Sequence, residues 1–201
     1  MRRLWLAVLL LAINGPVFAA LRVVSLAPSL SEIVIELDSA DLLVGVLDAG
    51  ERPAAIANLP SVGRYGQLDM ERLLSLKPDL LLLWPGSVGP AQRDQLQRLN
   101  IPTYVAEPHS LEQLSAQIEA IAGQLGRPER GVKLAADLRQ KLDNLRQRYH
   151  RDTPLKVFYQ VWDKPLYTVG GGQIISDALE VCGARNVFGD LSLPAPQVSI
   201  E

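Results

Sequence analysis

The chain has 201 residues and a formal net charge of −2, from 20 Lys and Arg against 22 Asp and Glu. This balance argues against nucleic acid as a partner, because binding to phosphates requires a clustered basic surface. Hydrophobic residues make up 48% of the chain, which excludes a disordered protein and is enough for a substantial core.

The N-terminus has the pattern of a secretory signal. Arg2 and Arg3 precede an unbroken run of ten apolar residues, 4–13, and the small residues within 17–19 predict cleavage after Ala19. The apolar run is too short to span a bilayer, which needs about 20 residues. No Cys follows the run, which argues against a lipid anchor. An exported chain with 18 basic and 22 acidic residues is therefore expected.

Strands and helices alternate through the first half of the chain. A β-branched strand is predicted over residues 22–27, followed by a helix over residues 28–37 that Ser29 or Ser31 caps. Residues 48–63 show no periodicity and are predicted to form a loop. Further elements are expected as a strand over residues 42–46, a helix over 70–76 capped by Asp69, a strand over 80–84, a helix over 90–99 and a strand over 103–105. This alternation predicts βαβ units around a parallel sheet.

The middle of the chain is predicted to be helical. Apolar residues recur at helical spacing over residues 110–125, and Pro128 is well placed to start a longer helix that runs to about Tyr149. Charged residues occupy the other face of the longer helix, and we interpret that face as solvated. These residues are Arg139, Lys141, Asp143, Arg146 and Arg148.

The rest of the chain predicts a second strand and helix, over residues 156–161 and 174–181. The fold class expected is α/β: two Rossmann-like lobes with central parallel sheets, joined by one long α-helix, with the second lobe incomplete. The expected divisions are a signal peptide at 1–19, an N-terminal lobe at 20–109, a helical connector at 110–153 and a partial C-terminal lobe at 154–201.

An internal repeat supports two lobes. The segment from Gly63 to Ser87 reads GRYGQLDMERLLSLKPDLLLLWPGS, and PAPQVSIE from Pro194 begins to repeat it before the chain ends. The alignment places Glu71 and Glu201 at matched helix starts. An acid in the first turn stabilises a helix by about 0.3–1 kcal/mol. Two equivalent acids are also suited to docking a two-fold symmetric basic partner, and spacing alone leaves both interpretations open.

The sequence offers no catalytic or metal-binding cluster. His109 and His150 are the only histidines, whereas transition-metal sites usually need several His or Cys ligands. The triple glycine at 170–172 lacks the spacing of a phosphate-binding loop and is interpreted as a turn. No nucleophile, base and acid are suggestively placed, so an enzyme is not expected. A secreted α/β enzyme is the alternative from a different functional class.

Four aromatic residues are predicted where strands end and loops begin: Tyr65, Trp84, Trp162 and Tyr167. The carboxyl ends of strands in an open α/β sheet are where ligands bind. Core packing is an equally good interpretation for Trp84, whereas Tyr65 has loop neighbours that bury little. A cleft lined by a few aromatic side chains suits a large, partly apolar ligand.

Cys182 is the only cysteine, which is unusual for an exported chain. One interpretation is a buried small hydrophobic residue at the end of a helix. The other is a disulfide whose partner lies outside this chain.

Three stretches together resemble one family: RVVSLAPSLSEIVIELDSADLLVGV, LPSVGRYGQLDMERLLSLKPDLLLLWPGS, and LEVCGARNVFGD with PAPQVSIE. The family is that of periplasmic substrate-binding proteins with a single rigid interlobe helix, which serve importers of cobalamin, haem and ferric siderophores. The resemblance covers essentially the whole mature chain and is strongest to the cobalamin-binding members.

The resemblance implies roles for individual residues. Glu71 and Glu201 would form salt bridges with arginines of the inner-membrane permease, one from each lobe. Tyr65, Trp84 and Tyr167 would line the ligand cleft, and we add Trp162 and Arg64 to the candidate ligand-binding residues. Cys182 matches a cysteine whose disulfide partner lies near the C-terminus of the cobalamin-binding members. Ala49 and Ala195 depart from the pattern, because those members carry aromatic residues there.

The resulting hypothesis is a monomeric periplasmic component of an ABC importer that binds cobalamin or a related corrinoid and delivers it to the permease. Cobalamin is the transported ligand, and no cofactor, bound metal or nucleic-acid partner is expected. A haem or ferric-siderophore binder of the same class is the alternative. An anionic siderophore would need cationic residues in the cleft, for which Arg52 and Arg64 are the candidates.

Overall fold

The computed structural model describes residues 20–199. The predicted signal segment with its cleavage site after Ala19, and the predicted docking residue Glu201, lie outside the described residues. In the part that is described, no helix is both long enough and apolar enough to cross a membrane.

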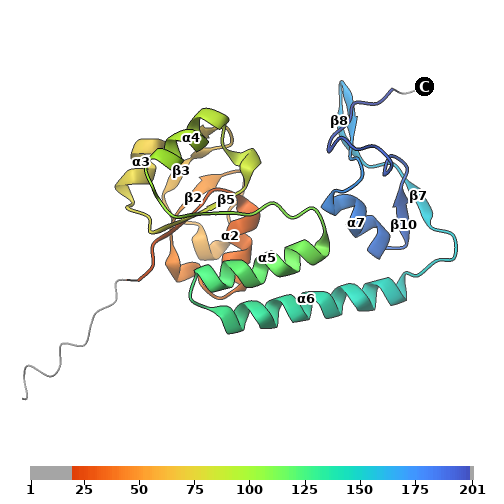
Figure 1. Ribbon diagram of the computed structural model, residues 1–201, viewed down its shortest axis with the longest axis horizontal. Helices are drawn as coiled ribbons and strands as arrows, with labels where there is room; N and C mark the ends of the chain where they lie inside the picture. Colours follow the sequence, from red (N-terminus) through yellow and green to blue (C-terminus); the bar gives the residue numbers. More distant parts are fainter. Residues whose placement is uncertain (1–19, 200–201) are drawn as a thin grey trace, which may run out of the picture.

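A six-stranded sheet forms the centre of residues 20–108, which we call the sheet region (Figure 1). Its strand order is β4-β3-β2-β1-β5-β6, and every neighbouring pair is parallel except the β3–β4 hairpin. The strands are β1 (Val23–Ser25), β2 (Leu43–Asp48), β3 (Ser61–Arg64), β4 (Gln67–Leu68), β5 (Leu80–Leu83) and β6 (Thr103–Val105). The central strands β1 and β5 are buried throughout, as a parallel sheet covered on both faces requires.

Helices cover both faces of this sheet. On one face α2 (Pro28–Glu36), α5 (Leu111–Gln124) and α6 (Pro128–Arg148) enclose a core that includes Leu30, Val34 and Ile121. On the other face α3 (Met70–Ser75) and α4 (Pro90–Arg98) enclose a second core that includes Leu73 and Leu96. The predicted α/β class is therefore confirmed by this doubly covered, mainly parallel sheet.

The start of α2 corrects a prediction about its cap. Pro28 occupies the first turn, Ala27 is the N-cap residue, and no side chain caps the helix. The Ser31 hydroxyl instead donates to Ser25 Oγ at 2.9 Å, and both serines are buried. Ser31 therefore ties the helix to the end of β1. The predicted cap at α3 is confirmed, because the Asp69 carboxylate accepts from the Arg72 amide at 2.8 Å.

The segment predicted as a loop over 48–63 contains additional structure. A short 3₁₀ turn at Ala54–Ile56 precedes β3, which forms a hairpin with β4. Gly63 has a φ of +112°, and a Cβ there would overlap the Gln67 carbonyl oxygen. The hairpin was missed because its strands are short and β3 contains a glycine, so they show no alternation of apolar and polar residues.

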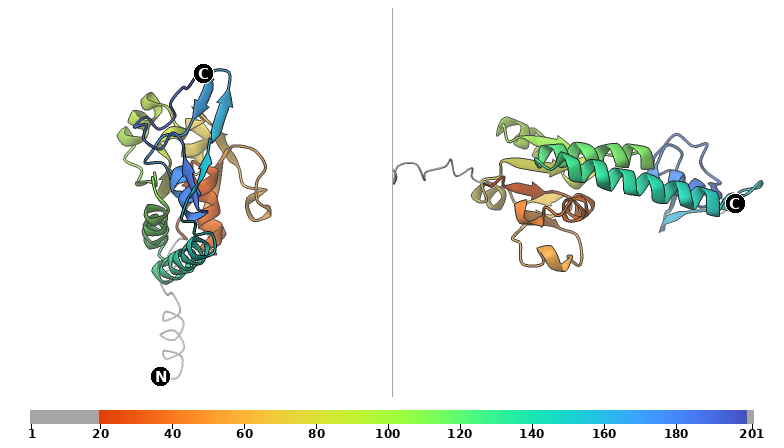
Figure 2. Two further views of the ribbon diagram at one scale, coloured as in Figure 1. Left: turned by 90° about the vertical axis from the view of Figure 1, so that its right-hand side faces the viewer. Right: turned by 90° about the horizontal axis from the view of Figure 1, so that it is seen from below.

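Helices α5 and α6 form an antiparallel pair that extends from beneath the sheet to the C-terminal part of the chain (Figures 1 and 2). Gly131 lets the helices approach closely, because a Cβ there would meet the Ala122 side chain. Arg139 donates to Glu119 at 2.8 Å and to Glu112 at 3.2 Å. The sequence predicted that Arg139 lies on a solvated face. Arg139 instead links the two helices.

The C-terminal segment, residues 154–199, carries two small sheets. Its elements are β7 (Leu155–Val157), β8 (Gln160–Asp163), β9 (Leu166–Thr168), α7 (Ile174–Val181) and β10 (Ala184–Asn186). Strands β7 and β10 pair in parallel, whereas β8 and β9 form an antiparallel hairpin. The single strand predicted over 156–161 is therefore wrong. The chain changes partners between Val157 and Gln160, because β7 pairs with β10 and β8 pairs with β9.

Cys182 lies at the C-cap of α7 and is exposed. The interpretation of Cys182 as a buried hydrophobic residue is therefore wrong. The face of α7 that packs inward presents Ser176 and Val181, and the helical period places Cys182 outside it. Its pairing with a cysteine outside the chain stays a prediction.

Candidate functional site

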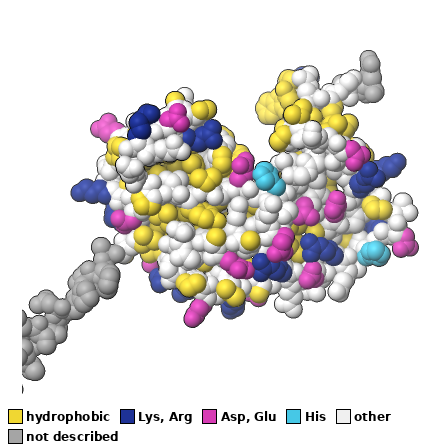
Figure 3. Space-filling model, in the orientation of Figure 1, with side chains coloured by type: hydrophobic (Ala, Val, Ile, Leu, Met, Phe, Trp, Pro, Cys, Tyr) yellow, Lys and Arg dark blue, Asp and Glu magenta, His cyan; other side chains and the backbone are white. Residues whose placement is uncertain are grey.

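A hollow separates the sheet region from the C-terminal segment, above the α5–α6 pair (Figure 3). We call this hollow the cleft. Strand β1 has β2 on one side and β5 on the other, so the strand order reverses next to β1. Ligands of open α/β sheets bind outside the carboxyl ends of the strands at such a reversal. The loops that follow β1, β3 and β5 lie at this edge of the sheet.

Tyr65 and Trp84 form an aromatic pair at this edge. Their ring centroids lie 5.6 Å apart with an interplanar angle of 51°. The Gly66 amide donates to the Ser87 carbonyl at 3.1 Å, which ties the β3–β4 turn to the loop after β5. Tyr65 is 48% exposed, and partial burial raises the pKa of its hydroxyl. Trp84 is half-buried and packs against the core, whereas its contact with a ligand stays a prediction.

Trp162 and Tyr167 form a second aromatic pair, on the β8–β9 hairpin. The two residues are directly opposite each other in the antiparallel ladder, which places their side chains on the same face. Trp162 is 61% exposed, whereas Tyr167 is half-buried. Figure 3 shows hydrophobic side chains gathered on the upper part of the C-terminal segment, where it borders the cleft. Among the described rings, no direct contact joins the two aromatic pairs.

Two of the charged candidates from the sequence, Arg64 and Glu71, are exposed. The Arg64 Nε donates to Gln67 Oε1 at 2.8 Å, within the β3–β4 turn. Glu71 lies in the first turn of α3, directly after the N-cap residue Asp69 and Met70, and its side chain is open to solvent. Since Glu201 lies outside the described residues, Glu71 is the member of the predicted docking pair that the structure places.

Arg52 is engaged within the loop that follows β2. Its guanidinium donates to the Asp48 carboxylate and to the Leu59 carbonyl. The Ser61 hydroxyl donates to the other oxygen of Asp48. These hydrogen bonds, from Ser61 first and then Arg52, lower the pKa of Asp48. The Arg52 guanidinium is therefore already hydrogen-bonded within this loop and stabilises it.

A stability prediction follows from the lowered pKa of Asp48. A carboxylate with a depressed folded-state pKa stabilises the fold above its unfolded-state pKa, and this stabilisation is lost as the pH falls through the folded-state value. Ser61→Ala should therefore reduce the loss of stability on acidification, measured as urea midpoints between about pH 6 and pH 3. Ser75→Ala, which removes an exposed hydroxyl bonded to the Arg72 carbonyl, is the control. Identical pH slopes in both variants would contradict the assignment.

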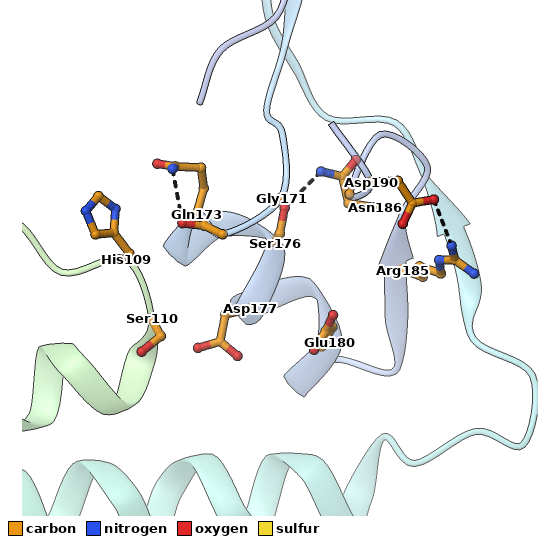
Figure 4. A pocket seen from close by; sticks show the side chains of 12 residues that line it. His109, Ser110, Gly171, Gln173, Ser176, Asp177, Glu180, Arg185, Asn186 and Asp190 are labelled. Carbon is orange, nitrogen blue, oxygen red and sulfur yellow. Dashed lines mark hydrogen bonds and ion pairs between the residues drawn. The ribbon is translucent and has the colours of Figure 1, made fainter. Parts of the chain in front are cut away.

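A polar pocket of about 300 Å³ lies beside α7, and the sequence did not predict it (Figure 4). Its lining includes His109, Ser110, Gln173, Asp177, Glu180 and Asp190. Asn186 donates to the Ser176 hydroxyl at 2.8 Å and to the Val169 carbonyl at 2.7 Å, so a buried polar network supports the wall. The only sequence signal was the glycine run at 170–172, which contributes Gly171 and Gly172 to the lining.

Metal coordination has no obvious site in the part of the chain that is described. Within residues 20–199, no three side chains among His, Cys, Asp and Glu are grouped so as to hold a metal ion. The structure thus has an aromatic pair in the sheet region, a second one on the β8–β9 hairpin, and a polar pocket beside α7.

Comparisons with known proteins identify the family. The model of the periplasmic binding protein family matches residues 23–201, which is nearly the whole chain after the predicted signal. The chain belongs to this family of periplasmic binding proteins.

Two relatives show how far the likeness extends. The vitamin B12-binding protein of Vibrio cholerae serotype O1 (strain ATCC 39541) is 36% identical over 184 residues, which cover 92% of this chain and 67% of the relative. The vitamin B12-binding protein of Yersinia pestis (strain Pestoides F) is 36% identical over 196 residues, covering 97% and 70%. This periplasmic binding protein thus spans about two thirds of the length of these relatives.

Solved structures agree with this assignment. The crystal structure of the periplasmic vitamin B12 binding protein BtuF of Vibrio cholerae has a TM-score of 0.79 at 35% identity, over 89% of this chain and 70% of that one. A periplasmic haem-binding protein from Pseudomonas aeruginosa has a TM-score of 0.74 at 28% identity, over 89% and 66%. The predicted family and fold class are confirmed. Members of the family are non-enzymatic components of transport systems, and their family name places them in the periplasm.

Proposed function

We propose that this periplasmic binding protein captures cobalamin or a related corrinoid in the cleft and delivers it to the permease of an ABC importer. The observation that supports the proposal is that the chain has two aromatic pairs, Tyr65 with Trp84 in the sheet region and Trp162 with Tyr167 on the C-terminal segment. The likeness to two vitamin B12-binding proteins at 36% identity supports the choice of ligand.

The chemistry of the cleft fits a large ligand with apolar faces and a polar rim. Each Trp or Tyr offers about 150–250 Å² of surface that is apolar over the ring and polar at one edge. A corrin macrocycle is a broad ring with amide side chains at its periphery. Aromatic faces on both sides would cover the ring, and the polar pocket beside α7 has hydrogen-bonding groups for amides. Clefts of this kind bind through apolar contact and a few placed polar groups.

Haem is the second candidate, because a haem-binding protein is 28% identical to this chain. Haem iron in proteins is held by axial ligands that include His and Tyr. Tyr65 is exposed beside the cleft and His109 lines the polar pocket, so both residue types are present.

A ferric siderophore is less well supported. Such anionic ligands require free cationic side chains, and Arg52 is held by Asp48 and the Leu59 carbonyl. Arg64 is then the remaining cationic candidate from the sequence, and it is already hydrogen-bonded to Gln67.

Parallel titrations test the choice of ligand. Aquocobalamin and haemin are added separately to the mature chain, and the quenching of Trp84 and Trp162 fluorescence is followed. Saturable quenching by aquocobalamin at micromolar concentration or below is expected, with weaker binding of haemin. Tighter binding of haemin than of aquocobalamin would replace the proposed ligand by haem.

The proposed domains are those predicted from the sequence, with lobes at 20–109 and 154–201 joined by a connector at 110–153. Each lobe would carry one docking residue. The exposed position of Glu71 supports its proposed role as a docking residue for a permease arginine, with Glu201 as its counterpart. Ligand release would then require the permease to separate the two lobes.

Glu71→Ala is expected to leave the Kd for cobalamin unchanged and to reduce the stimulation of importer ATPase several-fold, because Glu71 is exposed and belongs to neither aromatic pair. ATPase rates of the reconstituted importer against binding-protein concentration provide the measurement. Glu129→Ala removes an exposed acid from the first turn of α6 and controls for the loss of a favourable helix-dipole interaction. Loss of cobalamin binding in the Glu71 variant would contradict the docking role.

A further inference from the structure

The α5–α6 pair is attached firmly to the sheet region. Arg130, in the first turn of α6, donates to the Leu37 carbonyl at 3.1 Å and to Asp38 at the end of α2. The Arg139 contacts with Glu112 and Glu119 then fasten α5 to α6. These two helices and the sheet therefore form one unit. The width of the cleft then depends on how the C-terminal segment packs against this unit.

The C-terminal segment contacts this unit through α7, which packs against both α5 and α6. Residues 149–154, which link α6 to β7, are exposed, and the Tyr149 carbonyl lies close to Gly183. One hydrogen bond joins α7 directly to the start of α5. The Leu111 amide, at the first position of α5, donates to Asp177 Oδ2 on α7 at 2.6 Å, although the residues are 66 positions apart. Figure 4 shows Asp177 between α7 and the start of α5, beside Ser110.

Two further hydrogen bonds at the start of α5 are local. The Ser110 hydroxyl accepts from the Gln113 amide at 3.1 Å, and Gln113 Oε1 accepts from the His109 amide at 2.8 Å. Asp177, by contrast, caps α5 from another part of the molecule. A carboxylate at a helix N-terminus interacts favourably with the helix dipole, and a hydrogen bond to an ionised acceptor is stronger than a neutral one.

We propose that Asp177 is a positioning residue that fixes the orientation of the C-terminal segment, and hence the separation of the two aromatic pairs across the cleft. The hairpin with Trp162 and Tyr167 belongs to the same segment as α7, whereas Tyr65 and Trp84 belong to the sheet region. Without the hydrogen bond between Asp177 and the Leu111 amide, α7 is held less firmly against α5. The binding-competent orientation of the C-terminal segment is then populated less. Apparent affinity falls in proportion to that population. The effect on ligand affinity rests on the proposed function.

The test measures orientation separately from ligand binding. The full chain carries one spin label on the native, exposed Cys182 and a second on a cysteine that replaces the exposed Ser75 of α3. The distance distribution between labels is recorded for the wild type, Asp177→Ala, Asp177→Asn and Glu180→Ala. The Asn variant retains an oxygen acceptor for the Leu111 amide. Glu180→Ala is the matched control, because Glu180 lies on the same helix and lines the same pocket.

A broadened distance distribution is expected for Asp177→Ala, with near wild-type distributions for Asp177→Asn and Glu180→Ala. The Kd for cobalamin is expected to rise about 10-fold in the Ala variant and about 2-fold in the Asn variant. An unchanged distribution in Asp177→Ala, or equal broadening in Glu180→Ala, would overturn the positioning role. Absence of cobalamin binding by the wild type would overturn the proposed function, and the distances would still decide the role of Asp177 in orientation.

Discussion

Trp162→Ala is expected to raise the Kd for cobalamin about 30-fold while leaving the thermal midpoint nearly unchanged. Trp162 is 61% exposed, so little of its surface contributes to the fold. A bound ligand that covers about 80–100 Å² of the indole gains about 2 kcal/mol at about 25 cal/mol per Å². That free energy corresponds to roughly a 30-fold change in affinity.

Isothermal titration calorimetry measures this change without relying on tryptophan fluorescence. Trp162→Phe keeps an aromatic face and is expected to retain most of the affinity. Leu193→Ala removes another side chain of the C-terminal segment, one that is 64% exposed, and is the control for apolar surface in general. Equal affinities for Trp162→Ala and the wild type would remove this residue from the binding site.

Leu82→Ala is expected to lower the free energy of unfolding by about 2–5 kcal/mol, the range for truncating a buried leucine. Leu82 is fully buried in β5, which pairs with β1 on one side and β6 on the other. The cavity would open at the centre of the sheet, where neighbouring strands restrict relaxation. Since domains are typically stable by only about 5–15 kcal/mol, this loss is large.

Urea denaturation followed by circular dichroism measures the effect of Leu82→Ala, with the midpoint expected to fall and the slope to stay constant. Leu74→Ala is the control, because Leu74 is 42% exposed on α3 and its truncation should change stability by less than about 0.5 kcal/mol. A Leu82 variant as stable as the Leu74 variant would show that the core of the sheet region is not packed as described.

Elements with a strong local signal were predictable from the sequence. The run of four leucines in β5 and the long apolar period of α6 were placed to within one residue at each end. The cap at Asp69 was also identified, because a polar N-cap with an acid in the first turn is a local pattern. Such features depend on neighbours in the chain, which a single sequence displays directly.

Features that depend on distant partners were missed or misread. The hydroxyl of Ser31 bonds to Ser25 rather than capping α2, because the end of β1 lies beside the helix. The separation of β7 from β8 depends on β10, which follows about 30 residues later. The bond between Asp177 and Leu111 joins residues 66 positions apart, and no local pattern indicates it.

The candidate site was predicted only in part, because some of its features are local and others depend on distant residues. Aromatic residues at strand ends could be selected by type and position, and the structure pairs Tyr65 with Trp84 and Trp162 with Tyr167. Their mutual geometry and the polar pocket beside α7 depend on how the C-terminal segment packs against α5. That packing is set by tertiary contacts and not by the local sequence.

Calorimetric titration of the mature chain with aquocobalamin tests the central claim most directly, because it reports affinity and stoichiometry without a label. We predict one molecule of cobalamin bound per chain with a Kd at or below the micromolar range. No heat of binding at micromolar to hundred-micromolar ligand, with a chain that circular dichroism shows to be folded, would contradict the proposal that the cleft is a corrinoid site.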